Sequence, residues 1–224
     1  MKRALPVTAL FLDVGGVLLT NGWDHLARKR AARNFNLNWA EMDERHRLVF
    51  ETHEEGKLTF QEYLGWVVFY EKRTFTRDQF RDFMFAQSKP FPRMIELITQ
   101  LKHRHRLKIV VVSNESRAVN AHRICTFKLD QLADTFISSC FVRMRKPDVD
   151  IFRLALDLAQ TPAEHVVFID NTASSSRLQK VWGCEASFTR ITNPLAPSWP
   201  LSDYRRTAGA SKKPSKQLNP ALTE

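Results

Sequence analysis

The chain has 224 residues, with 34 Lys or Arg against 24 Asp or Glu and a formal net charge of +10. This length suits one domain, or one domain with an inserted subdomain, and a hydrophobic content of 43% excludes a globally disordered chain. No apolar run reaches the roughly 18 residues of a transmembrane helix, so we expect no membrane partner. The apolar run that ends at Asp13 is too short for a secretory signal, and the three Cys are scattered without metal-ligand spacing. We therefore expect a cytoplasmic protein with reduced thiols, of which Cys125 and Cys140 are buried.

Hydrophobic patterning predicts strands that alternate with helices. In chain order, we expect a strand at 7–13 and then four amphipathic helices, at 23–35, 40–54, 59–72 and 76–86. After a Pro-containing linker at 88–92, we expect a helix at 93–102, a strand at 108–112, a helix at 117–127, a strand at 135–139, a helix at 148–158 and a strand at 166–170. This alternation predicts an α/β fold, in which helices cover both faces of a parallel sheet.

The positive charge is concentrated near the C-terminus. Residues 172–224 carry eight Lys or Arg and three acidic residues, which is half of the net charge. No motif that reads a nucleic-acid groove accompanies them, so we expect no nucleic-acid partner. A nucleic-acid binder remains the third hypothesis, and binding that depended on residues 172–224 alone would favour it.

Polar residues follow three of the predicted strands: Asp13, the pair Ser113 and Asn114, and Asp170. Ligands of open parallel sheets bind beyond the carboxyl ends of the strands, so these residues are expected to converge on one crevice. Two buried carboxylates repel each other unless a cation lies between them, and Mg²⁺ prefers carboxylate and phosphate oxygens. Asp13 then suits a nucleophile that forms an aspartyl-phosphate, while Ser113 binds phosphoryl oxygens and Lys146 neutralises the moving charge.

Four segments resemble the sequence motifs of the haloacid dehalogenase-like (HAD) hydrolases, in the right order. They are residues 11–18 (Phe-Leu-Asp-Val-Gly-Gly-Val-Leu), 112–114 (Val-Ser-Asn), 145–148 (Arg-Lys-Pro-Asp, with Ile151 and Phe152) and 168–171 (Phe-Ile-Asp-Asn). The resemblance implies a Rossmann-like core at 1–18 and 89–190 and a helical C1 cap at 19–88. It also implies a Mg²⁺-dependent phosphatase of small phosphorylated metabolites.

The same resemblance assigns the site residues. Asp13 is the nucleophile, with Ser113 and Lys146 as the other catalytic residues. Gly16 and Asn114 contact substrate. Asp13, the Gly15 carbonyl and Asp170 hold Mg²⁺.

Two residues depart from the usual phosphatase pattern. Gly15 stands two residues after the nucleophile, where most of these phosphatases have an Asp that acts as general acid. The sugar-phosphate phosphatases of the superfamily that are similar to the glucose-1-phosphate type also have Gly there, so the proton must come from another source. Asn171 replaces a common second acid. Dehalogenases of the superfamily also lack the Asp two residues after the nucleophile, and they use no metal. A dehalogenase is therefore the alternative, although the loop of these enzymes usually carries an aromatic residue where Gly15 stands.

Residues 191–224 do not fit the core pattern, because they hold five Pro and little periodicity. One interpretation is an irregular basic tail. Another is that the tail is read out of frame. Residues 187–205 can be back-translated into a nucleotide sequence that, read two nucleotides further on, encodes a strand end followed by an amphipathic helix. A coding sequence without that alternative frame would contradict the second interpretation. If it holds, a non-catalytic product with an altered C-terminus is a further alternative, while substrate identity and oligomeric state stay open.

Overall fold

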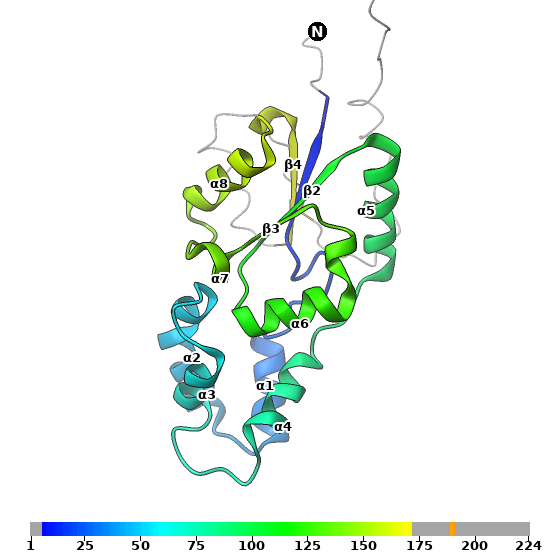
Figure 1. The fold of residues 1–224 in the computed structure, drawn as a ribbon. Coiled ribbons are helices and arrows are strands. Elements are labelled where there is room, and N and C mark those ends of the chain that lie inside the picture. The colour runs from blue at the N-terminus through cyan, green and yellow to red at the C-terminus, as the bar shows by residue number, and fades with distance from the viewer. Residues whose placement is uncertain (1–5, 172–188, 191–224) are drawn as a thin grey trace, which may run out of the picture.

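Buried apolar runs form a sheet whose strands are all parallel (Figure 1). The computed structural model describes residues 6–171 and 189–190. The strand order is β3-β2-β1-β4-β5. The strands span Ala9–Leu12 (β1), Lys108–Ser113 (β2), Thr135–Ser138 (β3), Val166–Asp170 (β4) and Thr189–Arg190 (β5). The predicted α/β fold class, with its Rossmann-like parallel sheet, is confirmed.

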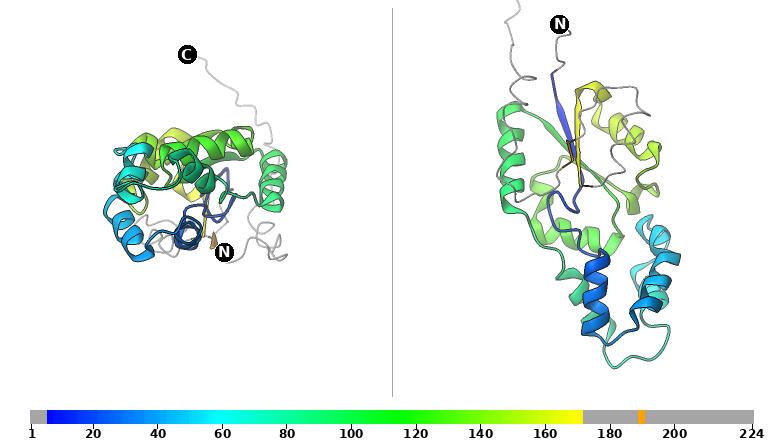
Figure 2. Two further views of the ribbon diagram at one scale, coloured as in Figure 1. Left: turned by 90° about the horizontal axis from the view of Figure 1, so that it is seen from below. Right: turned by 180° about the vertical axis from the view of Figure 1, so that it is seen from behind.

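Helices cover both faces of this sheet (Figure 2). On β1, Leu10 and Leu12 face one hydrophobic cluster, which includes Met94 and Ile98 of α5 (Pro92–His105). Ala9 and Phe11 face the other cluster, which includes residues of α8 (Val149–Ala159). Because successive side chains of a strand point to opposite faces, a central strand buried on both faces must be apolar throughout. The remaining elements near the sheet are α6 (Arg117–Phe127), η1 (Leu129–Gln131), α7 (Ser139–Val142) and η2 (Ala163–His165).

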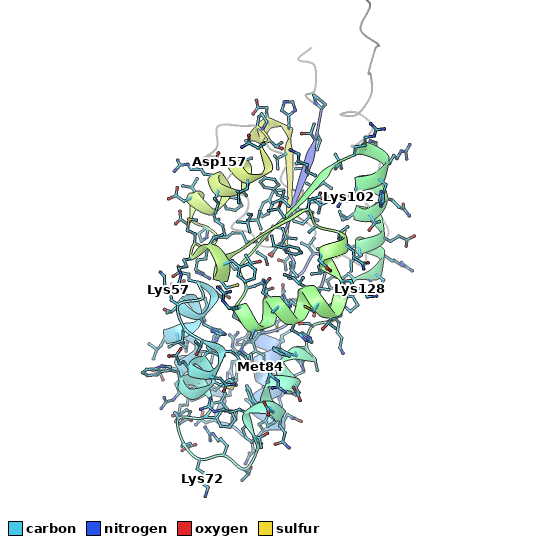
Figure 3. All side chains as sticks on the ribbon, in the orientation of Figure 1. Lys57, Lys72, Met84, Lys102, Lys128 and Asp157 are labelled. Carbon is cyan, nitrogen blue, oxygen red and sulfur yellow. The ribbon has the colours of Figure 1, made fainter. Side chains whose placement is uncertain are left out.

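Four helices lie between β1 and α5 in the chain and beyond the carboxyl ends of the strands (Figure 1). They are α1 (His25–Asn34), α2 (Trp39–Glu54), α3 (Phe60–Val67) and α4 (Arg77–Phe85). We call them the helical insert. Their buried side chains form a third hydrophobic cluster, which contains Tyr63, Phe80 and Met84. In Figure 3, Met84 lies inside this insert, whereas Lys72, Lys128 and Asp157 lie on the outside of the molecule.

Local sequence signals set most helix ends. The side chains of Thr59 and Glu62 cap α3 reciprocally, and Thr76 and Gln79 do the same for α4. The helix predicted over 59–72 ends at Val67, which shortens it by five residues. Arg73 explains part of this early end, because its Nε donates to the Val68 carbonyl oxygen at 2.7 Å and satisfies a group that the helix leaves free.

The predicted burial of the two cysteines is confirmed for one of them. Cys140 is buried as expected, but Cys125 is exposed, because it lies on the outer side of α6. Residues 172–188 and 191–224 lie outside the described part of the chain, so the basic tail and the alternative frame stay predictions. Within the described residues, no helix is long and apolar enough to cross a membrane.

Candidate active site

Three polar side chains predicted for the site meet at the carboxyl ends of β1, β2 and β4. Asp13 directly follows β1, and its amide N donates to the Ile169 carbonyl oxygen at 2.9 Å, which extends the strand pairing by one residue. The Ser113 Oγ donates to Asp13 Oδ1 at 2.6 Å. The exposed fractions are 8% for Asp13, 1% for Ser113 and 2% for Asp170. The sheet register therefore places two buried carboxylates on neighbouring strands.

Lys146 bridges the two carboxylates. Its Nζ lies 3.1 Å from Asp13 Oδ2 and 2.7 Å from Asp170 Oδ2. Burial lowers the pKa of Lys146, but the two carboxylates outweigh burial and hold the pKa above its ordinary value. Lys146 is therefore a permanent cation beside the candidate nucleophile.

Asn114 positions Lys146. The Asn114 Oδ1 accepts from the Lys146 amide N at 2.8 Å, and the Asn114 Nδ2 donates to the Lys146 carbonyl oxygen at 2.9 Å. These two hydrogen bonds tie the end of β2 to the loop before α8. The sequence suggested a substrate contact for Asn114, and this positioning role was not anticipated.

The loop after Asp13 requires glycine at one position. Gly16 has φ +72°, and a Cβ there would lie 1.9 Å from Asn171 Nδ2, so both the backbone and the neighbour exclude a side chain. Gly15 lies in a more open place: a Cβ there would be 3.2 Å from Asn21 Oδ1 and 3.9 Å from Arg123 Nη1. The Asn171 Nδ2 donates to Asn21 Oδ1 at 3.2 Å, which joins the strand end to the start of the helical insert.

The donor chemistry of this centre fits a hard divalent cation. Among the described residues, no group of three or more His, Cys, Asp or Glu could hold a metal, so a cation here would need main-chain and substrate oxygens as well. Asp13 and Asp170 present carboxylate oxygens at the ends of neighbouring strands, with Lys146 in contact with both. Such oxygen ligands suit Mg²⁺, which usually keeps waters and phosphate oxygens in its coordination shell.

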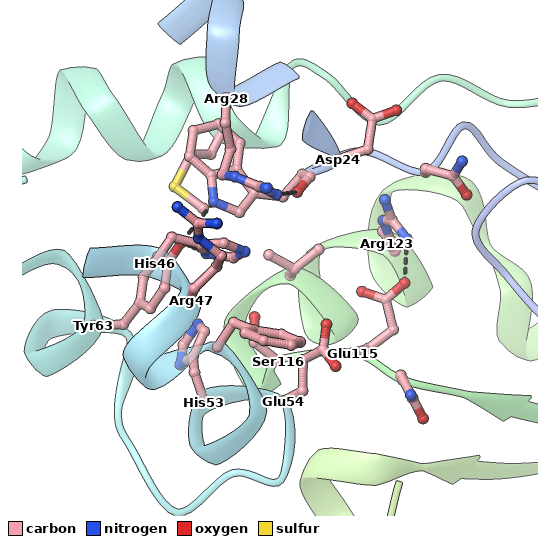
Figure 4. A pocket seen from close by; sticks show the side chains of 16 residues that line it. Asp24, Arg28, His46, Arg47, His53, Glu54, Tyr63, Glu115, Ser116 and Arg123 are labelled. Atoms are coloured by element: carbon pink, nitrogen blue, oxygen red, sulfur yellow. Dashed lines mark hydrogen bonds and ion pairs between the residues drawn. The ribbon is translucent and has the colours of Figure 1, made fainter. Parts of the chain in front are cut away.

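A cavity of about 400 Å³ lies between the helical insert and the segment formed by the loop after β2 and α6 (Figure 4). It is lined by Asn21, Trp23, Asp24, Arg28, His46, Arg47, Phe50, His53, Glu54, Tyr63, Met84, Asn114, Glu115, Ser116, Val119 and Arg123. Of the predicted site residues, only Asn114 belongs to this lining. The cavity therefore adjoins the carboxylate centre and presents side chains of the insert to it.

The two histidines of the cavity are neutral. Burial lowers the pKa of His46 to about 3 and that of His53 to about 4. The Tyr63 hydroxyl accepts from Trp23 Nε1 at 2.7 Å and lies 2.8 Å from His46 Nδ1. Trp23, His46 and His53 each pack against an aromatic side chain of the insert, and they also line the cavity.

A buried ion pair joins the sheet to both connections of the insert. Arg123, with 2% of its surface exposed, pairs with Glu115, which directly follows Ser113 and Asn114. The Arg123 Nε donates to Ser88 Oγ at 3.0 Å, and the Arg123 Nη2 donates to the Thr20 carbonyl oxygen at 3.2 Å. Sequence reasoning missed this pair, although an acidic residue immediately after Ser113-Asn114 was a signal that could have drawn attention to it.

A second ion pair also crosses from the insert to the sheet. Arg145 Nη2 lies 2.8 Å from Glu54 Oε2, and Arg145 Nη1 lies 2.6 Å from Glu51 Oε1. Burial raises the pKa of Glu54, although Arg145 opposes the shift. Because Arg145 precedes Lys146, this pair connects α2 to the segment that carries the bridging lysine.

Comparison with known proteins identifies the family of this chain. A profile of the haloacid dehalogenase-like hydrolases matches residues 7–174. The chain belongs to this family. It is therefore a hydrolase, and the resemblance of its four motifs is confirmed. A search of curated protein sequences gives no significant match.

Solved HAD structures share the fold. A HAD family enzyme from Bacteroides thetaiotaomicron is similar with a TM-score of 0.72 and 19% identity, over 89% of this chain and 99% of that one. The wild-type form of that enzyme with magnesium and inorganic phosphate has a TM-score of 0.71 and 18% identity, over 88% and 98% of the two chains. L-2-haloacid dehalogenase from Xanthobacter autotrophicus has a TM-score of 0.58 and 16% identity, over 89% and 81%. At these identities the similarity supports the fold, and both phosphate and haloacid chemistry occur among the matches.

Proposed function

We propose that this HAD hydrolase is a Mg²⁺-dependent phosphatase of small phosphorylated metabolites, with an aspartyl-phosphate intermediate on Asp13. The observation that carries the proposal is the pair of buried carboxylates, Asp13 and Asp170, at the ends of neighbouring strands with Lys146 in contact with both, because carboxylate oxygens are the ligands that Mg²⁺ prefers. The magnesium and phosphate bound to the Bacteroides enzyme support the same chemistry. The Gly at position 15 resembles the sugar-phosphate phosphatases, so sugar phosphates are the first substrates to test.

In this proposal Asp13, the Gly15 carbonyl and Asp170 would hold Mg²⁺, and the bound ion would supply positive charge that stabilises the phosphoryl oxygens. Asp13 attacks phosphorus, and the bond between phosphorus and the ester oxygen breaks. The Ser113 hydroxyl, which hydrogen-bonds Asp13 in the described structure, orients the nucleophile and contacts the phosphoryl group. Lys146 neutralises charge as the phosphoryl group moves, while Gly16 brings the main chain close to it.

We propose the division of the chain that the motifs implied: a core at 1–18 and 89–190 and a C1 cap at 19–88. The separate hydrophobic cluster of the insert supports this division. The two connections also pair with each other, since the Thr20 amide N donates to the Lys89 carbonyl oxygen at 2.8 Å and the Phe91 amide N donates to the Leu18 carbonyl oxygen at 2.9 Å. A cap joined by two adjacent connections can cover the carboxylate centre without disturbing the sheet.

A dehalogenase is the second candidate, and the Lys146 bridge favours it. One lysine between Asp13 and Asp170 reduces their repulsion without a metal, and a halide leaving group needs no proton. The Gly15 loop argues against it, because it lacks the aromatic side chain usual in those enzymes.

Phosphate release from sugar phosphates and from an aryl phosphate tests the proposal, with and without Mg²⁺. We expect activity that needs Mg²⁺ and is abolished by Asp13→Asn, which keeps the shape of the side chain and removes the nucleophilic charge. Folded wild-type protein that releases chloride from 2-chloropropionate without Mg²⁺, and releases no phosphate, would establish the dehalogenase instead.

A further inference from the structure

Position 15 leaves the proposed phosphatase without its usual proton donor. An alkoxide leaving group of a sugar phosphate is a strong base, and its departure is slow unless a proton reaches the ester oxygen. A Cβ at position 15 would lie 3.2 Å from Asn21 Oδ1 and 3.9 Å from Arg123 Nη1, so an acid there would be close to this guanidinium. That same Nη1 is already paired with the Glu115 carboxylate.

We propose that Glu115 is the general acid and base of this site, and that it supplies from β2 the carboxyl that Gly15 lacks. This inference rests on the proposed phosphatase function and names a catalytic residue for it.

Two contacts hold Glu115 in the loop that follows β2. Its amide N donates to Ser139 Oγ at 2.9 Å, and the Ser139 Oγ in turn donates to the Glu54 carbonyl oxygen at 2.6 Å. Its carboxylate is held by Arg123, which Ser88 and Thr20 hold in place. Glu115 lines the cavity together with Glu54, and the two carboxyl groups lie on the same side of it in Figure 4. The acid is therefore held in the loop that directly follows β2, the strand whose last residue, Ser113, donates to Asp13.

The electrostatic surroundings suit proton transfer at neutral pH. Burial raises the pKa of Glu115 to about 7; Arg123 from α6 opposes this shift, while Asp13 from β1 and Glu54 from α2 add to it. A group with a pKa near the working pH both gives and takes a proton readily. Arg28 and Arg47 are the other cations that line the cavity, and His46 and His53 are neutral there.

The proposed reaction has two balanced steps. In the first, Asp13 attacks phosphorus, the ester bond breaks, and the proton of Glu115 moves to the departing ester oxygen. In the second, the Glu115 carboxylate takes a proton from water as the water oxygen attacks phosphorus. The bond between phosphorus and Asp13 then breaks, which regenerates the Asp13 carboxylate and the protonated Glu115.

Glu54 is the competing carboxyl, and its contacts favour an ion-pair role. The Arg145 Nε and Nη2 both donate to Glu54 Oε2, at 3.3 Å and 2.8 Å. Glu54 also belongs to the insert, whereas Glu115 lies in the loop between β2 and α6. Glu54→Gln is thus the matched comparison for Glu115→Gln.

The leaving group separates general acid catalysis from a structural role. Nitrophenolate leaves without a proton, whereas the alkoxide of a sugar phosphate does not. We expect Glu115→Gln to lower kcat/KM on sugar phosphates by about 10²-fold or more, and on 4-nitrophenyl phosphate by less than about tenfold. Gly15→Asp in the Glu115→Gln background should restore activity on sugar phosphates, because the Cβ of the new side chain would lie 3.9 Å from the same Arg123 Nη1.

The outcomes are distinguishable. Equal losses on both substrates by a folded Glu115→Gln protein overturn the assignment of Glu115 alone, as does a leaving-group-dependent loss seen only with Glu54→Gln. Folded wild-type protein that hydrolyses neither phosphate overturns the proposed function and this assignment together. If Glu115→Gln does not fold, the wild type carries the test: kcat/KM on sugar phosphates should fall as pH rises through about 7, with no such fall on 4-nitrophenyl phosphate. Matching pH profiles for the two substrates contradict the assignment.

Discussion

Arg123→Met probes the buried ion pair through stability. The substitution keeps much of the side-chain volume and leaves the Glu115 carboxylate buried without its cation. Removing one partner of a buried pair costs about 3–5 kcal/mol. The lost hydrogen bonds to Ser88 and Thr20 add about 1 kcal/mol each. We therefore expect the free energy of unfolding to fall by about 5–7 kcal/mol at pH 8.

The loss should depend on pH in a defined direction. The pKa of Glu115 is raised from 4.5 to about 7 in the folded protein, so the folded state binds the proton more tightly than the unfolded state. The wild type therefore loses stability as pH rises from about 4.5 to about 7. Arg123 lowers the pKa of Glu115, so without Arg123 that pKa rises further in the folded state. The free-energy cost of burying the charged Glu115 carboxylate then grows. At pH 5 Glu115 binds a proton in both proteins, so the variant should lose only about 2 kcal/mol there.

Urea unfolding at pH 5 and pH 8 measures both values. Arg153→Met is the control, because Arg153 forms an exposed ion pair with Asp150 on α8, and such pairs are worth about 0–1 kcal/mol. A destabilisation by Arg123→Met that is equal at the two pH values would refute the argument that the unpaired Glu115 charge carries the cost.

Two further predictions concern packing. Gly16→Ala should lower the free energy of unfolding by about 1–3 kcal/mol and reduce activity, because Gly16 has φ +72° and a Cβ would overlap Asn171. Gly65→Ala on α3 is the control and should leave stability unchanged or raise it, so equal shifts of the melting temperature would contradict the strain argument. Phe80→Ala should cost about 3–5 kcal/mol, because Phe80 is fully buried among the aromatic side chains of the helical insert. Leu48→Ala, at an exposed position, should change stability by less than about 0.5 kcal/mol in the same unfolding assay, and similar losses for both would contradict the assigned core.

The sequence predicted those parts of the molecule that depend on local patterning. Continuous apolar runs predicted the positions of β1, β2 and β4, because a central parallel strand is buried on both faces. The segment at β3, whose first two residues are only half-buried, was predicted as a short strand. The polar residues after those strands predicted the convergence of Asp13, Ser113 and Asp170, since parallel strands end at one edge. Lys146 was placed by its motif, and the structure adds the contact with both carboxylates.

Contacts between distant segments were the part that sequence patterning did not predict. The helix over 59–72 ends early partly because Arg73, beyond its expected end, binds the Val68 carbonyl oxygen. Asn114 supports the main chain of Lys146, 32 residues away. Arg123 joins Thr20, Ser88 and Glu115, which no periodicity in one element brings together. Such contacts follow from the packing of the insert on the sheet.

Arg123 also connects the departure at position 15 to the rest of the site. A carboxyl at position 15 would belong to the loop after β1, and the nearby Asp13 would influence its pKa. A carboxyl from the end of β2 reaches the same guanidinium from another strand, and that guanidinium binds both connections of the insert. A movement of the insert that displaces Thr20 or Ser88 would therefore change the position of Arg123 and with it the pKa of Glu115. If Glu115 is the proton donor, proton transfer at this site is coupled to the position of the insert over the cavity. A proton donor at position 15, on the loop after β1, would not need this coupling.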